Sequence, residues 1–188
     1  MGRQTHHVVN SSPLRLDRNV AAKRRAALIY NPRTAPFTQS FLPILEAAAR
    51  SKALEPIAAA VHDTAELETF IAKQGREPGG SLIAQTDAFV TINRDLINAA
   101  AAKYRLPAIF PSRQFAEAGG LVGYGNRVVD IYKGAATYVD RILRGAQPAD
   151  LPVQLPVNFE LTINLKTARA LGLTVPPTLL ACADEVIE

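Results

Sequence analysis

The stretch EPIAAAVHDTAELETFIAKQGREPGGSLIAQ, residues 55–85, decides the fold class because it holds a complete strand–helix–strand unit. Residues 55–61 and 80–85 are apolar runs of strand length. Between them, Asp63 is placed to cap a helix, with Glu66 three residues later as its capping-box partner. Apolar runs without strict alternation are typical of parallel strands that are covered by helices on both faces.

The same alternation extends on both sides of this unit, from Arg25 to Gly145. Further strands are predicted at 25–30, 106–111 and 119–125, and further helices at 38–51, 93–104 and 126–145. Glycines are placed to end two helices, Gly75 and Gly145, and Asn126 is placed to cap the last one. Alternating strands and helices predict an α/β fold of three layers, with a mainly parallel sheet and right-handed crossovers.

The remainder of the chain differs at both ends. Residues 1–23 are polar and basic, so we expect a disordered tail there, followed by a ligand-binding lobe over 24–118. The segment 119–188 adds a crossover strand, the long helix, a connection rich in proline and a closing strand and helices. Prolines at 148, 152 and 156 predict that the connection is extended, and the chain is expected to end in a helix.

Composition excludes several classes of protein. With 48% hydrophobic and 20% charged residues, the chain has enough apolar side chains for a globular core. The net charge of +4 lies partly in the basic tail, but no aromatic platform or recognition helix accompanies it, so no nucleic acid is expected as a partner. Cys182 is the only cysteine, and the His residues lack metal-ligand spacing, so we expect no disulfide, metal or cofactor.

Candidate site residues come from the loops that follow the predicted strands, because ligands of open α/β sheets bind at the carboxyl ends of strands. These loops supply polar, charged and aromatic side chains: Asn31, Thr34, Asp87, Ser112, Arg113, Phe115, Glu117 and Tyr124. The set suits a small zwitterion, with Asp87 or Glu117 facing an ammonium group and Arg113 facing a carboxylate. Asp87 has an equal alternative as a helix cap or turn residue.

An enzyme is not expected. The chain has no phosphate-binding loop, no dinucleotide fingerprint and no nucleophile elbow. Glycines in GGLVGYG, residues 119–125, lack the dinucleotide spacing and are expected to permit tight packing at a crossover. Ser112 has no histidine partner, since His62 follows a different strand. An unrelated flavodoxin-like enzyme is disfavoured for the same reasons.

Several stretches together resemble a known family. They are YNPRTAPF (30–37), REPGGSLIAQTDAF (76–89), RLPAIFPSRQFAEAGGLVGYG (105–125) and the whole segment from AATYVDRIL (135–143) to ADEVIE (183–188). From about Lys23 onward, the chain resembles the C-terminal portion of ABC-transporter substrate-binding proteins, in the subfamily that includes tryptophan and tyrosine binders.

That resemblance implies a periplasmic-binding fold of type I, in which two Rossmann-like lobes clamp a ligand and deliver it to a membrane permease. The resemblance implies that the ligand is an amino acid or a related small molecule, with aromatic amino acids among the candidates. The resemblance begins at the second lobe, so a single-lobe form with weak or lost binding is expected. The family implies a periplasmic location, whereas the first residues show no secretory signal, so the chain as written is expected in the cytoplasm. A ligand-sensing effector domain of a regulator, with the same fold, is the alternative.

The helix predicted at 126–145 carries more apolar residues than one buried stripe needs. Without a first lobe, Val129, Tyr132, Ala136 and Val139 would lack a partner. Exposed apolar surface of this kind favours association. We therefore expect a homo-oligomer, or an exchange of this helix and the terminal segment between copies.

Overall fold

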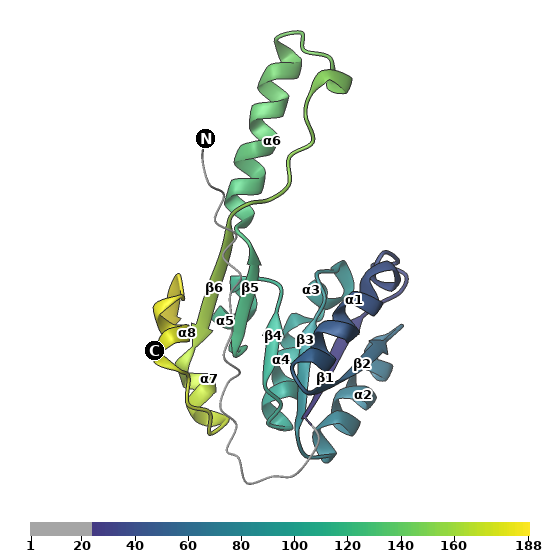
Figure 1. Ribbon diagram of the computed structural model, residues 1–188, viewed down its shortest axis with the longest axis vertical. Helices are drawn as coiled ribbons and strands as arrows, with labels where there is room; N and C mark the ends of the chain where they lie inside the picture. Colours follow the sequence, from purple (N-terminus) through teal and green to yellow (C-terminus); the bar gives the residue numbers. More distant parts are fainter. Residues whose placement is uncertain (1–23) are drawn as a thin grey trace.

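The computed structural model describes residues 24–188, and the predicted tail over residues 1–23 lies outside the described part of the chain. Within it, strands and helices alternate (Figure 1). Their order is β1 (Arg24–Tyr30), α1 (Thr38–Ser51), β2 (Leu54–Ala60), α2 (Thr64–Arg76), β3 (Gly80–Ala84), α3 (Ala88–Ile92), α4 (Arg94–Lys103), β4 (Ala108–Phe110), α5 (Arg113–Glu117), β5 (Val122–Asn126), α6 (Val128–Leu143), the 3-10 turn η1 (Pro148–Asp150), β6 (Phe159–Asn164), α7 (Leu165–Ala170), α8 (Pro177–Ala181) and β7 (Glu185–Ile187).

All strands of the described residues form one sheet in the order β2-β1-β3-β4-β5-β6-β7. Neighbouring strands are parallel except β5 and β6, which pair antiparallel. The first five strands have the 2-1-3-4-5 order of doubly wound folds. The predicted α/β class with a mainly parallel sheet is therefore confirmed.

The larger core lies between the sheet and the helices α2 and α4. Leu67 and Ile71 of α2 and Ile97 of α4 are fully buried there, against inward side chains of the central strands. Phe110 of β4 stacks on Phe115 of α5, with ring centroids 4.9 Å apart. These are the side chains that the helical and strand periodicities place inward, so burial follows the sequence pattern.

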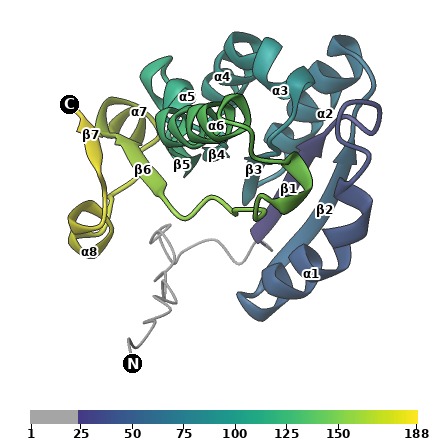
Figure 2. The same cartoon turned by 90° about the horizontal axis from the view of Figure 1, so that it is seen from above.

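On the opposite face of the sheet, the helices of the described residues lie at the two ends. α1 contacts β2 at one end, and residues of α8 pack on β5 and β6 at the other (Figure 2). Between them, no described helix covers Ile83 of β3 and Ile109 of β4, which are paired neighbours and remain 37% and 40% exposed. Tyr124 and Phe159 continue the same face on β5 and β6, and both are exposed. We call these four residues the uncovered sheet face.

Residues 127–158 form an arm that projects beyond the ends of the strands (Figure 1). α6 rises from the end of β5, and an extended segment returns beside it to β6. At the base of the arm, the Arg127 N–H donates to the Asn158 carbonyl over 3.0 Å, and the Asn158 amide donates to Asp130 over 2.9 Å. No residue of α6 is buried.

Several local predictions were wrong, each for a physical reason. Asn126 does not cap α6, because it is the last residue of β5 and pairs with Phe159. Gly75 does not end α2, which runs to Arg76. Its lack of a side chain instead leaves room for Tyr104, which a Cβ would meet.

Three further differences concern hydrogen bonds and chain ends. Glu66 accepts a bond from the His62 N–H, not from that of Asp63, so the capping box is incomplete. The connection rich in proline begins with the 3-10 turn at Pro148–Asp150, which a proline at the first helical position permits. The chain ends in a strand, β7, because the edge of β6 offers backbone hydrogen bonds to it.

Among the residues that the structure describes, no helix is long and apolar enough to cross a membrane.

Candidate functional site

The loops at the carboxyl ends of β1 and β3 form the candidate site. β1 is followed by a crossover to β2 on one side, whereas β3 is followed by helices that lead to β4 on the other. The loops after β1 and β3 therefore leave the sheet in opposite directions. In doubly wound sheets, this divergence is where ligands bind.

Asp87 joins the two loops. Its carboxylate accepts hydrogen bonds from the Asn31 N–H over 2.9 Å, from the Thr34 hydroxyl over 2.8 Å and from the Val90 N–H over 3.1 Å. The last of these makes Asp87 the N-cap of α3, as its alternative interpretation predicted. Asp87 is only 7% exposed, and these bonds use about three of its four lone-pair sites, so it can accept one more donor.

Asn31 fixes the start of the same loop. Its side-chain amide donates to the His62 carbonyl over 3.1 Å, and its side-chain oxygen accepts from the Arg33 N–H over 2.8 Å. Asn31 is buried, whereas Arg33 and Thr34 are exposed at the edge of the sheet. The sequence thus brings Asn31, Thr34 and Asp87 together, with Arg33 beside them.

The predicted residues of the β4–α5 loop lie apart from this cluster. Arg113 pairs with Glu117 over 2.7 Å and with Glu185 of β7 over 3.1 Å. Its charge therefore lies toward the β7 edge of the sheet, away from Asp87. The hydrogen bond to Glu117 and the charges of both carboxylates raise the pKa of Arg113. Ser112 is half-buried at the N-cap of α5 but makes no side-chain capping bond, and Phe115 is only 2% exposed.

Tyr124 lies on a different surface, where it stacks on Phe159 with ring centroids 5.9 Å apart. Phe159 was not among the predicted site residues, because the antiparallel pairing of β5 with β6 was not expected from sequence. The only signal was an aromatic residue directly after the connection rich in proline.

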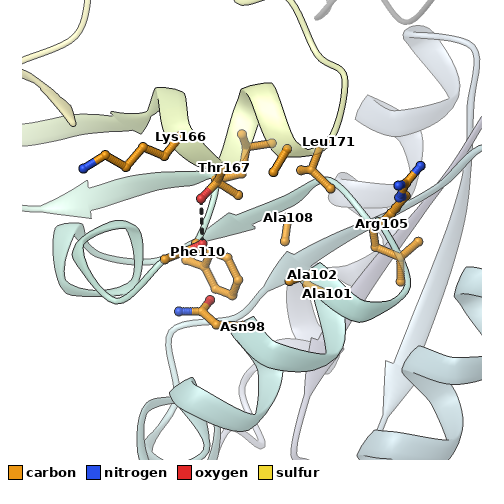
Figure 3. A pocket seen from close by; sticks show the side chains of 14 residues that line it. Asn98, Ala101, Ala102, Arg105, Ala108, Phe110, Lys166, Thr167 and Leu171 are labelled. Carbon is orange, nitrogen blue, oxygen red and sulfur yellow. Dashed lines mark hydrogen bonds between the residues drawn. The ribbon is translucent and has the colours of Figure 1, made fainter. Parts of the chain in front are cut away.

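Two cavities lie away from the carboxyl edge. One of about 300 Å³ lies between α4, α7 and the starts of β4 and β5, and is largely apolar (Figure 3). Asn98 and Thr167 line it, and the Thr167 hydroxyl donates to the Gly119 carbonyl over 2.9 Å. The other, of about 490 Å³, lies beside Arg25 and Glu55 at the amino ends of β1 and β2. Neither includes a residue of the predicted set.

No three His, Cys, Asp or Glu side chains from Arg24 onward lie close enough together to hold a metal ion. The cluster around Asp87 holds hydrogen-bond donors and acceptors in fixed positions at the carboxyl edge. Such an arrangement can bind and orient a polar molecule.

Solved structures with the same fold include three bacterial proteins. A conserved domain protein from Vibrio cholerae O1 biovar El Tor superimposes with a TM-score of 0.76 at 25% identity, over 88% of this chain and 55% of that one. An ABC domain in complex with L-Trp, from Streptococcus pneumoniae, gives a TM-score of 0.78 at 23% identity over the same shares. A ligand-free, open substrate-binding protein with adhesive properties from Clostridium difficile gives a TM-score of 0.61 at 18% identity, over 87% and 54%.

The chain thus spans about half the length of these solved structures. A search of curated proteins finds no match. The model of one family, described as ABC transporter substrate binding protein, matches residues 18–187. This match covers nearly all of the chain, so the chain belongs to the ABC transporter substrate-binding protein family.

Proposed function

We propose that the carboxyl edge around Asn31, Thr34 and Asp87 is one jaw of a cleft that binds an amino acid or a related zwitterion. The protein would be the solute-binding component of an ABC importer. It would act outside the cytoplasm and deliver its ligand to a permease in the membrane. The observation that carries the proposal is the cross-linking of the two diverging loops by Asp87. It holds polar groups in fixed positions where this fold binds ligands.

The charges at this edge suit a zwitterion. Among described residues, no acidic partner lies within ion-pair distance of Arg33, so its guanidinium is available to a ligand carboxylate. The unused lone pair of Asp87 suits an ammonium group. Arg113 and Glu117 largely neutralise one another, so we assign them a weaker part in binding than Arg33.

An aromatic amino acid is the ligand class that we favour. The related structure from Streptococcus pneumoniae holds L-Trp, and the fold of the two chains is the same. Tyr124 stacks on Phe159 on a surface apart from the Asp87 cluster, so we assign these two rings no contact with the ligand. Phe115, being buried, would support the loop rather than touch the ligand.

The test is a thermal-shift titration with L-Trp, L-Tyr and L-Leu. We expect L-Trp to raise the melting temperature of the unaltered chain, because binding to the folded state stabilises it by mass action. Arg33→Ala should abolish the shift. Arg76→Ala is the matched control, since Arg76 is also exposed and ends α2 at the opposite edge of the sheet. Equal shifts in both variants would exclude Arg33, and no shift with any amino acid would refute the proposal for this chain.

A further inference from the structure

α6 is an amphipathic helix whose apolar side has only part of a partner. Ten apolar residues cover roughly half of its circumference at about 100° per residue. The return segment lies along one part of this side, where the Tyr138 hydroxyl donates to the Pro152 carbonyl. The other part is free. It is a stripe at alternating spacings of three and four: Val129, Tyr132, Ala136, Val139 and Leu143.

This set, which we call the α6 stripe, is unusually open. Tyr132 is 73% exposed and Leu143 is 82% exposed, and the other three members are exposed as well. The spacing is that of a helix face which packs on another element. An apolar surface of this extent is typical of an interaction site.

The uncovered sheet face is the complementary surface. Ile83 and Ile109 lie side by side on β3 and β4, and Tyr124 and Phe159 extend the patch toward the base of the arm. The ends of the same face are occupied by α1 and α8, and no described helix lies between them (Figure 2). Sheets in α/β folds are normally covered by helices on both faces.

α6 cannot fill the gap in its own chain. It begins two residues after β5 ends, and it runs away from the sheet (Figure 1). The hydrogen bond from Arg127 to Asn158 and the pairing of Asn126 with Phe159 fix this direction at the base. Within residues 24–188, therefore, α6 has an apolar stripe that no sheet covers, and the sheet has a face that no helix covers.

We propose that two copies of this chain exchange α6, so that the α6 stripe of each covers the uncovered sheet face of the other. Each copy carries both the α6 stripe and the uncovered sheet face. Two copies can therefore make the same contact twice, which closes a two-fold dimer. α6 has 16 residues and is therefore about 24 Å long and about 10 Å wide. Two such contacts remove on the order of 1,000 Å² from solvent, which is the lower limit for a biological interface.

The exchange also places the candidate site. α6 projects from the carboxyl edge of its own sheet, so the sheet that it covers lies beyond that edge. By two-fold symmetry, the carboxyl edge of each copy then faces the carboxyl edge of the other. A second copy would thus supply an opposing jaw. The dimer itself rests on the two apolar surfaces alone and does not depend on the proposed ligand.

Crosslinking tests which surfaces meet. In a Cys182→Ser background, Tyr132→Cys and Ile109→Cys chains with different tags are mixed, refolded together and treated with a short bismaleimide. We expect a crosslinked heterodimer from the mixture and only monomer from either variant alone. Dimers from Tyr132→Cys alone would show pairing of α6 with α6 and would overturn the exchange. No crosslink in any sample would also overturn it, as when residues 1–23 of the same chain cover the face.

Light scattering with size-exclusion chromatography tests the role of the α6 stripe. The chain of 20.3 kDa should elute with twice that mass. Val139→Lys should convert it to a monomer, because a charge would be buried in the contact. Thr137→Lys, on the polar side of α6, should remain a dimer, and circular dichroism should show both variants folded. A monomeric unaltered chain, or a dimeric Val139→Lys chain, would refute the proposal.

Discussion

Asp87 shows how one residue can serve the fold and the candidate site together. Its carboxylate caps α3 and also holds the loop after β1, in a position that is nearly closed to solvent. Removing a buried acceptor leaves its donors unsatisfied, which costs more than the bonds contribute on average. The loop geometry at the carboxyl edge therefore depends on the Asp87 side chain, with or without a ligand.

We expect Asp87→Ala to lower the free energy of unfolding by about 3 kcal/mol, because a cap and a buried backbone donor both lose their acceptor. Asp63→Ala is the control, since Asp63 caps α2 in the open and should cost about 1 kcal/mol. Urea unfolding at one fixed protein concentration measures both. Equal losses would show that Asp87 acts as a cap alone.

Glu66 makes stability depend on pH. The His62 N–H donates to its carboxylate, and with the bond to the His62 ring it lowers the pKa of Glu66 below its usual 4.5, while Asp63 opposes the shift. A lowered pKa in the folded state contributes stability above the unfolded pKa, and this is lost as the pH falls through the folded value. Glu66→Gln keeps an acceptor without titrating.

We therefore expect the unaltered chain to lose more stability than Glu66→Gln when the pH is lowered from neutral to below 4.5. The difference should be small, since Glu66 is exposed and solvent screens it. Urea unfolding across this pH range provides the measurement. Parallel pH profiles of stability for the two chains would show that Glu66 has the same pKa in the folded and the unfolded state.

At this scale the sequence was informative where a role is local. The N-cap position of Asp63 follows from a three-residue spacing and was predicted, and that of Asp87 was one of two equal alternatives. The partner of Glu66 was not predicted, because two neighbouring N–H groups compete for its carboxylate and the backbone conformation decides between them. The ion pair of Arg113 with Glu185 joins residues 72 positions apart, which no local pattern encodes.

At the scale of elements, β5 depends on glycine. A Cβ on Gly125 would overlap the Pro111 carbonyl oxygen, and one on Gly123 would overlap that of Ser112. The β4–α5 loop therefore lies directly against β5. This confirms the expected tight packing at Gly120, Gly123 and Gly125, whereas a Cβ on Gly119 would meet nothing within 4 Å.

We expect Gly125→Ala to lower the free energy of unfolding by about 2 kcal/mol or more, because backbone atoms must move to admit the methyl group. Gly134→Ala is the matched control within α6, where a Cβ would meet nothing within 4 Å. It should raise helix stability by about 1 kcal/mol, in line with the helix propensity of alanine. Thermal unfolding monitored by circular dichroism compares the two, and a neutral Gly125→Ala would contradict the close approach.

The elements that sequence missed are those whose pairing is not local. The β1–α1–β2–α2–β3 unit was predicted to within a few residues, because each strand and helix carries its own period. The short helix α3 and the last strand β7 were not predicted. The three residues of β7 become a strand only because β6 presents a free edge beside them, and the antiparallel turn from β5 to β6 depends on the arm between them.

At the scale of the whole molecule, the sequence indicated that α6 would lack a partner, and the structure shows its apolar residues exposed. It did not indicate the matching gap on the sheet. That gap depends on where α1 and α8 lie across the strands, which is a property of the assembled layers. The expected oligomer remains a prediction, and the exchange of α6 gives it a specific geometry.

Hydrogen exchange tests the assembled molecule without any substitution. In a separate copy, no residue of α6 is buried, so the amides of α6 should open locally while those of β1 and β3 exchange only on global unfolding. If two copies exchange α6, dilution should release it by mass action. We therefore expect the protection of residues 128–143 to rise with protein concentration and to fall on dilution, while that of the α2 and α4 core is unchanged. Protection of α6 that stays equal at all concentrations would mean that its partner lies within one chain.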